Sequence, residues 1–249
     1  MFKEKVLPIG KVFYSDLIPE LEHYFTTRES FLKSSESDTE IKHTSNNRKL
    51  LANYFHIKEE HLISPTQTHS SNIDMATINK TDYPNTDALI LTNKEQAIFL
   101  NFADCTPIIL YDKKNNIGAI AHAGWRGTVS KIAPKTVKKI LELNNETSCK
   151  NIYAVIGPAI SSCCYNVGQE VIDGVTKSVN NTNGLFYNKN DKIYIDLKEV
   201  NKRQLEEFGL PTENIDTCPY CTSCNNDLFF SYRKENGTTN RHNAIIKLI

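Results

Sequence analysis

Short apolar runs separated by turn residues dominate the middle of the chain. Between positions 63 and 123 they are NIDMATI, DALILT, AIFLNF, PIILYD and NIGAIAHA. Runs of this length, rich in β-branched residues and bounded by turn residues, are typical of strands. The segment DKKNN between PIILY and IGAIA predicts the loop of a β-hairpin. Two further strands are predicted at Tyr153–Ile156 and in the terminal AIIKLI.

Apolar residues at helical spacing predict helices elsewhere in the chain. Between positions 130 and 143, Ile132, Val137 and Ile140 fall on one helical face and lysines on the other. A further helix is predicted to begin after the capping residues Thr44 and Ser45, because the polar segment 29–47 before it is typical of a surface loop. The four predicted helices cover residues 48–54, 130–143, 169–178 and 196–208.

The order of these elements predicts the fold class. Strands outnumber helices and come in runs, which favours an α+β domain over a repeating βαβ unit. A chain of 249 residues can form one large domain or two small ones, and no segment has the composition of a linker. We therefore expect one domain covering residues 1–249.

Composition and charge exclude several classes of function. Lys plus Arg number 29 and Asp plus Glu number 29, so the formal net charge is zero. This balance does not favour binding to nucleic acid or to an anionic membrane. No apolar run reaches the length of a membrane span, and the N-terminal segment lacks the apolar centre of a signal peptide. We expect a cytoplasmic protein whose seven cysteines, an odd number, do not form a disulfide framework.

Histidine and cysteine occur in three short motifs where predicted strands meet loops. The motifs are QTHS with His69, ADCTP with Cys105 and AHAGWRG with His122. Imidazole and thiolate suit zinc, and three protein ligands leave a fourth position open, as in catalytic zinc sites. The separations of 36 and 17 residues match no zinc-finger spacing. Taken singly, a histidine near a strand end is more often a hydrogen-bonded surface or core residue, and a cysteine in an apolar strand is usually a small buried hydrophobe.

The motifs taken together resemble the laccase-domain family. Its members were first called multicopper polyphenol oxidases and were later described as purine nucleoside phosphorylases. The resemblance implies two packed mixed or antiparallel β-sheets flanked by helices, in α/β/β/α layers. It also implies that His69, Cys105 and His122 are catalytic metal ligands, for zinc rather than copper. The motifs occur in the family order: FTTR (25–28), NR (47–48), QTHS (67–70), ADCTPIIL (103–110), AHAGWRGT (121–128), GPAISSCCYNVG (157–168) and FFSYRK (229–234).

The resemblance implies a function as well. Members of the family convert adenosine, inosine, guanosine or methylthioadenosine plus phosphate to the base and ribose-1-phosphate, and also deaminate adenosine. Small-molecule nucleosides and phosphate are therefore the expected partners. Arg48, Arg126 and Arg233 are candidates for phosphate binding, since a guanidinium fork matches phosphate geometry. Gln67 and Asp104 complete the predicted substrate-binding set, and Asp104 is also suited to orient a metal ligand.

The chain departs from the family pattern at three places. Asn166 follows the CCY element, where an acidic residue is usual. Thr239-Asn240-Arg241 stands where the family has TGR, and the loop at 29–47 is shortened and lacks the family's LNL-like element. These departures concern substrate contacts and not the metal ligands.

Three other functions compete with a zinc phosphorylase. Cys105 would be the nucleophile and His122 the base of a metal-free cysteine hydrolase or amidase, acting for example on peptidoglycan precursors. A copper oxidase of phenols needs many paired histidines, but the chain has seven histidines and no H-x-H motif. A binding module without catalysis would turn over no nucleoside.

The remaining cysteines raise the question of a second metal. Cys218, Cys221 and Cys224 form CPYCTSC, to which His242 would add a fourth ligand. We favour instead that they are buried thiols beneath a strand formed by FFSY. Cys163 and Cys164 are not expected to share a metal, because neighbours on an extended chain face opposite ways.

Overall fold

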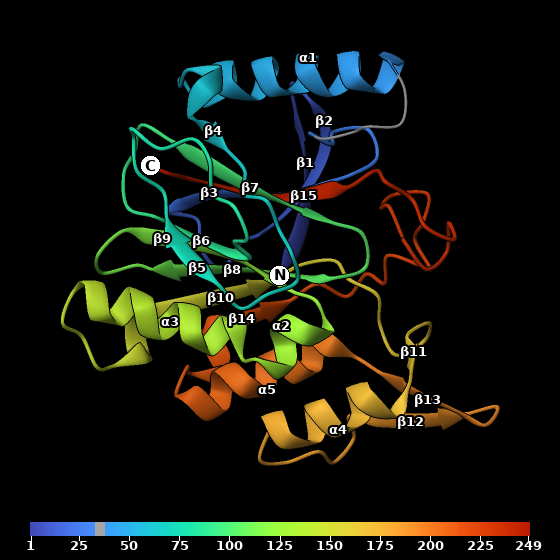
Figure 1. Cartoon of the computed structure of the whole chain (residues 1–249). Helices are drawn as coiled ribbons and strands as arrows, with labels where there is room; N and C mark the ends of the chain where they lie inside the picture. The colour runs from blue at the N-terminus through green and yellow to red at the C-terminus, as the bar shows by residue number, and fades with distance from the viewer. Residues whose placement is uncertain (33–37) are drawn as a thin grey trace.

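Two six-stranded sheets pack face to face in the computed structural model, which describes residues 1–32 and 38–249 (Figure 1). Strands pair antiparallel except for β4 with β7, β5 with β6 and β10 with β14. The first sheet contains, in spatial order, β1 (Phe2–Leu7), β2 (Gly10–Ser15), β3 (Leu21–Thr26), β15 (His242–Leu248), β7 (Ala97–Phe102) and β4 (Leu62–Ile63). The second contains β14 (Ile215–Thr217), β10 (Ile152–Ile156), β8 (Thr106–Asp112), β9 (Ile117–Ala123), β6 (Ala88–Leu91) and β5 (Ile73–Met75).

Helices cover the outer faces of both sheets, and a small third sheet lies beside α4 (Figure 1). The helices are α1 (Asp38–Tyr54), α2 (Trp125–Val129), α3 (Ile132–Leu143), α4 (Gln169–Ser178) and α5 (Leu197–Phe208). The short 3-10 helices are η1 (Glu59–His61), η2 (Cys149–Asn151) and η3 (Thr212–Asn214). The third sheet consists of β11 (Asn166–Val167), β13 (Lys192–Ile195) and β12 (Phe186–Lys189). Among the described residues, no helix combines the length and the apolar character needed to cross a membrane.

Apolar burial explains the layer order. Between the sheets, side chains such as Phe25 and Leu100 of the first meet Ile109 of the second, and all are fully buried. Leu51 on α1 packs on the outer face of the first sheet. Val137 on α3 packs on the outer face of the second. Removing this apolar area from water at about 25 cal/mol per Å² is the main force holding the layers together. The expected α+β class with two packed sheets between helices is confirmed.

Most of the predicted elements are present. The DKKNN loop joins β8 and β9, which pair antiparallel along their whole length. Helices α3, α4 and α5 lie where the apolar spacing placed them, and Asp196 caps α5 by accepting a hydrogen bond from the backbone N–H of Lys198 at 2.9 Å. These elements are long or strongly periodic, so local sequence is enough to specify them.

Other elements differ from the expectation. Helix α1 begins at Asp38, so Thr44 and Ser45 lie inside it and do not cap it. Its first turns are polar and mostly exposed, which made them resemble a loop, and the rest of the predicted loop at 33–37 falls outside the described residues. The three N-terminal strands and the third sheet were not predicted. Strand β1 is an exposed edge strand with charged side chains, so it carries little apolar signal.

Candidate metal centre

His69, Cys105 and His122 meet at one end of the second sheet. Their ligand atoms all lie within 4.8 Å of one another. Cys105 directly precedes β8 and His122 lies on β9, and these strands pair so that Thr106 is opposite Ala123. The hairpin therefore brings the thiol and the imidazole together across 17 residues of sequence. His69 arrives from the loop before β5, with its backbone in the left-handed region at φ 61°.

A buried carboxylate, Asp87, holds two of the three candidate ligands in place. Asp87 accepts hydrogen bonds from the backbone N–H of His69 at 3.0 Å and of Ser70 at 2.7 Å, and from the Ser70 hydroxyl at 2.7 Å. It also accepts one from Nδ1 of His122 at 2.8 Å. A proton on Nδ1 leaves the Nε2 lone pair of His122 free for a metal, as in other carboxylate–histidine–metal arrangements.

Asp87 was missed by the sequence analysis. It is the first residue of DALILT, which was interpreted only as a strand. An aspartate that opens an otherwise apolar, fully buried run was the available signal, because a buried carboxylate needs several donors. Burial raises the pKa of Asp87, but hydrogen bonds from His122 and Ser70 outweigh it and hold the pKa well below its usual range.

The electrostatics of the triad favour a thiolate. Burial raises the pKa of Cys105, but the His122 and His69 imidazoles outweigh burial and lower that pKa to about 6. Burial lowers the pKa of His122, whereas Cys105 and Asp87 raise it to about 9. A thiolate at neutral pH is both a metal ligand and a nucleophile. The charges alone therefore do not separate a metal centre from a cysteine hydrolase.

The residues fit zinc. Zinc bonds of about 2.0–2.3 Å place tetrahedral ligand atoms roughly 3.3–3.8 Å apart, which is compatible with three donors that all lie within 4.8 Å of one another. The donor types suit this ion, and the carboxylate that fixes the tautomer of His122 is present. Three protein donors leave one position for a substrate or water, which is the catalytic arrangement.

Gly124 packs directly against the triad, so Gly124→Ala is expected to weaken metal binding. A Cβ there would lie 2.9 Å from Sγ of Cys105 and 3.2 Å from Cδ2 of His69, which pushes both donors out of position. We expect a loss of metal affinity of about 10- to 100-fold, the range seen when the support of a ligand is disturbed. The measurement is competition for zinc with a chromophoric chelator.

Gly168→Ala is the matched control, because a Cβ at Gly168 meets nothing within 4 Å and the backbone φ there is −85°. Unchanged zinc affinity in Gly124→Ala would show that the triad is not packed as described.

The triad opens onto a cavity of about 640 Å³. Its volume lies within the range of about 300–1,000 Å³ typical of small-molecule sites. The cavity brings together four of the five predicted substrate-binding residues. These residues are Gln67, Asp104, Arg126 and Arg233. Aromatic and aliphatic side chains form much of the remaining wall, namely Trp125, Ile160, Tyr165, Leu197 and Tyr232.

Three guanidinium groups line the cavity. Arg126 is exposed and lies over the Trp125 ring at 4.3 Å. Arg233 donates to Oδ1 of Asn166 at 2.7 Å, so the asparagine that replaces the usual acidic residue still contacts this arginine. Arg241 was not singled out by the sequence analysis. It belongs to the TNR element that departs from the family pattern, and it donates to the carbonyl of Thr238 at 2.6 Å.

Gln67 and Asp104 hold the cavity walls in place. Nε2 of Gln67 donates to the carbonyl of Asn101 at 2.9 Å, and its Oε1 accepts from the Asn101 N–H at 2.8 Å. Asp104 accepts from the Thr222 hydroxyl at 2.6 Å and from the backbone N–H of Arg233 at 2.7 Å. Both side chains thus join loops that are distant in sequence.

Arg48 lies apart from the cavity. On α1, its Nη2 donates to the carbonyl of Leu62 at 3.2 Å, and its guanidinium lies over the Phe99 ring at 5.3 Å. Burial lowers the pKa of Arg48, although Glu59 opposes this effect. These contacts join α1 to the outer face of the first sheet.

The CPYCTSC segment matches the expectation only in part. Cys218 and Cys221 are buried, as expected, but Cys224 is exposed and residues 229–231 form no strand. His242 is buried against the rings of Phe102 and Phe229. His242 belongs to neither His/Cys group found among the described residues. Cys221 and Cys224 instead lie beside Cys163 and Cys164.

Comparison with known proteins identifies the relatives of this chain. Residues 27–249 match the family model described as multi-copper polyphenol oxidoreductase laccase. The purine nucleoside phosphorylase YlmD of Bacillus subtilis is 33% identical over 211 residues, covering 80% of this chain and 75% of that protein. Adenosine deaminase RL5 from an unknown prokaryotic organism is 32% identical over 198 residues, covering 75% of each. The crystal structure of the hypothetical protein YfiH of Bacillus licheniformis superposes with a TM-score of 0.87 at 30% identity, covering 99% of both chains.

Proposed function

Because this chain belongs to the multi-copper polyphenol oxidoreductase laccase family, we propose that it is a zinc-dependent purine nucleoside phosphorylase of the cytoplasm. Its substrates would be adenosine, inosine, guanosine or methylthioadenosine with phosphate, and its products the base and ribose-1-phosphate. The name of the Bacillus subtilis relative supports this reaction. Both relatives are named as enzymes that act on nucleosides, and this broader activity is what they share.

The observation that carries the proposal is the combination of groups around one cavity. A His–Cys–His donor set, three arginines and several aromatic rings all face it. Guanidinium groups bind phosphate, and aromatic rings stack on the flat faces of purines. A cysteine hydrolase would need the thiol and the imidazole but would not require the arginines.

The side chains suggest how phosphorolysis would proceed. Phosphate held by Arg126, Arg233 and Arg241 would attack C1′ of the ribose as the bond from C1′ to the purine nitrogen breaks. The departing base carries away the electron pair of that bond, and the sugar passes through a state with oxocarbenium character. Positioning of the two reactants and charge complementarity would supply most of the rate.

Tyr165 lines the same cavity as the triad and can act as a hydrogen-bond donor there. Burial raises the pKa of Tyr165 to about 12, with the charges of Cys105 and Asp104 adding to the effect, so its phenol stays protonated and can donate a hydrogen bond. Zinc, when held by His69, Cys105 and His122, supplies positive charge and Lewis acidity beside the cavity.

Adenosine deamination is a second candidate reaction, favoured by the printed name of the 32% identical relative RL5. It would replace the amino group at purine C6 by oxygen from water and release ammonia. The same donor set and cavity would serve it, because polarising an attacking water is a common role of such zinc sites.

The test is one assay series on the purified chain. We would measure bound metal and then incubate the protein with adenosine, with and without phosphate, before and after chelation. Adenine release that requires phosphate and is lost with zinc would support phosphorolysis, and inosine formation would support deamination. Hydrolysis of amide substrates that survives chelation would replace both by the cysteine hydrolase.

Arg126→Ala is expected to raise the KM for phosphate about 10-fold or more while changing the KM for adenosine little, because a charge-assisted contact to phosphate is lost. Phosphate saturation curves at fixed adenosine measure this effect. Arg48→Ala is the matched control, since Arg48 lies outside the cavity. If Arg48→Ala raises the phosphate KM and Arg126→Ala does not, phosphate binds elsewhere.

A further inference from the structure

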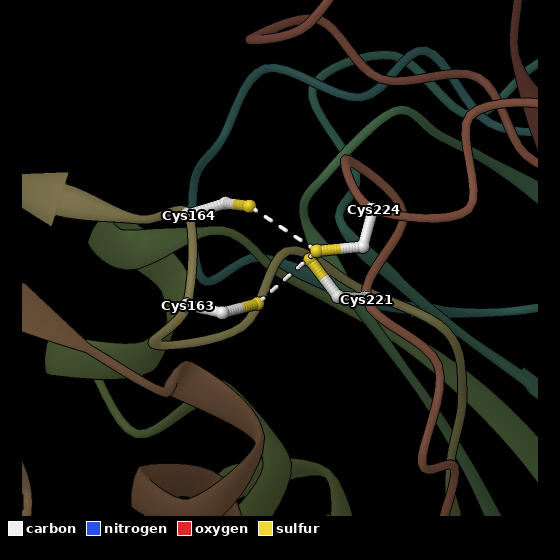
Figure 2. Close-up of side chains that lie close together, drawn as sticks. All are labelled: Cys163, Cys164, Cys221 and Cys224. Atoms are coloured by element: carbon white, nitrogen blue, oxygen red, sulfur yellow. Dashed lines mark hydrogen bonds between the residues drawn. The ribbon is translucent and has the colours of Figure 1, made fainter.

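Four cysteine thiols converge a short way from the triad. Cys163 and Cys164 come from the loop after β10, and Cys221 and Cys224 come from the loop after β14. Their sulfur atoms all lie within 4.8 Å of one another. Sγ of Cys224 is 3.4 Å from Sγ of both Cys163 and Cys164. Figure 2 shows the two pairs of side chains pointing toward each other from facing loops.

The local backbone explains why neighbouring cysteines converge here. Residues 162–164 form a turn, in which the backbone N–H groups of Cys164 and Tyr165 both donate to the carbonyl of Ser161 at 2.9 Å. In a turn, unlike an extended strand, consecutive side chains do not point in opposite directions. The extended backbone on which the expectation for Cys163 and Cys164 rested is absent here, and all four sulfurs lie close enough to reach one ion.

The loop that carries Cys221 and Cys224 has a turn geometry suited to metal-binding cysteines. The backbone N–H of Asn225 donates to the carbonyl of Cys221 at 2.9 Å, which closes the C-x2-C turn. The backbone N–H of Ser161 points at Sγ of Cys221 at 3.4 Å, and those of Ser223 and Cys224 do so as well. Backbone donors directed at a sulfur stabilise a thiolate and are a common feature around metal-bound cysteines.

The spacing of the sulfurs fits one ion. Four sulfurs around a tetrahedral zinc with bonds of about 2.3 Å lie roughly 3.8 Å apart, close to the observed separations. In an iron–sulfur cluster the cysteines bind several different iron atoms, so their sulfurs lie farther apart than the ligands of one zinc ion. Disulfides join sulfurs only in pairs, so they do not account for all four sulfurs gathering around one point.

We propose that Cys163, Cys164, Cys221 and Cys224 bind one zinc ion as a closed tetrathiolate site, separate from the His69–Cys105–His122 centre. With all four positions filled by protein ligands, the site is structural and not catalytic. Cys163 and Cys224 are exposed, which gives the ion a path of entry. The proposal does not depend on which reaction the cavity catalyses.

The site would hold two walls of the cavity together. The loop with Cys163 and Cys164 also carries Tyr165, and the loop with Cys221 and Cys224 leads to Arg233. Nη1 of Arg233 reaches the carbonyl of Cys164 at 3.5 Å. An ion bound by both loops would therefore fix Arg233 and Tyr165 relative to each other. Its loss should alter the cavity without removing the triad's metal.

The experiment is metal analysis of the full-length protein purified under reducing conditions. We expect about two zinc ions per chain, as two mononuclear sites predict, and loss of about one in Cys224→Ser and in Cys163→Ser. Cys105→Ala should lose the other ion, and a double variant should lose both. Cys149→Ser, a thiol outside both groups, is the control. Substitution with Co²⁺ should give an intense sulfur-to-cobalt charge-transfer band that is weaker in Cys224→Ser.

Three results would overturn the proposal. The first is that Cys224→Ser and Cys163→Ser both bind as much zinc per chain as the unmodified protein. Intact mass could show a disulfide between these cysteines in place of bound metal. Iron could be bound in place of zinc. Both variants replace exposed side chains, so circular dichroism and a melting curve will establish that they fold before metal is counted.

Discussion

Replacing Cys105 by alanine is expected to remove the metal from the His69–Cys105–His122 centre and to lower the rate of phosphorolysis by about 10³-fold or more. The thiolate is the only anionic donor of the triad, so its loss leaves two neutral imidazoles to hold a dication. The site would also lose the charge that raises the pKa of His122. The measurements are zinc content and kcat/KM with adenosine and phosphate.

The fold should survive this change, because Cys105 lines the cavity and is only partly buried against the core between the sheets. Cys149→Ala is the control, because Cys149 lies in η2 just before β10 and belongs to neither His/Cys group. This variant should keep both metal and activity. Full turnover in Cys105→Ala would remove the triad from the reaction. Loss of turnover with full zinc content would instead favour Cys105 as a nucleophile.

Replacing Asp87 by alanine is expected to have the largest effect on stability. The carboxylate is fully buried and accepts hydrogen bonds from His122, from Ser70 and from the backbone of Thr68 and His69. Breaking such a network leaves the buried imidazole of His122 and several part-buried donors without an acceptor, at a cost of about 3–5 kcal/mol. Metal affinity should fall about 10- to 100-fold as well, because His122 loses the group that orients it. Urea unfolding and zinc competition measure the two effects.

The pH dependence of unfolding tests the same residue. Because the folded-state pKa of Asp87 is depressed, its contribution to stability is present above its unfolded pKa of about 3.9. That contribution is lost as the pH falls through the lower folded-state value. Asp87→Asn should therefore lose stability at neutral pH and differ less from the unmodified protein in acid.

Asp74→Ala is the matched control, since Asp74 is a partly exposed carboxylate on the neighbouring strand β5, paired with Lys80 at 2.6 Å. Such a surface pair contributes about 0–1 kcal/mol. Equal effects of Asp74→Ala and Asp87→Ala on unfolding would show that the buried network does not act as described.

Local sequence determined the parts of this protein that depend on near neighbours. The apolar runs identified β6 to β10, the DKKNN segment identified the β8–β9 hairpin, and amphipathic spacing identified α3, α4 and α5. The motifs QTHS, ADCTP and AHAGWRG identified His69, Cys105 and His122 as candidate metal ligands. The family resemblance of these motifs predicted the order of the layers. Each of these signals lies within a few residues or within a recognisable motif.

Tertiary structure alone decided which side chains meet. In the sequence, Asp87 looks like the start of a strand, and only the loop folded over it shows that it contacts two of the three candidate metal ligands. Arg48 lies in a motif but packs on the outer face of the first sheet, whereas Arg241 reaches the cavity. Cys164 and Cys224 are 60 residues apart, and their proximity depends on two turns and on the pairing of β10 with β14. Such contacts join distant segments, so no local pattern records them, and the packing of the sheets sets them.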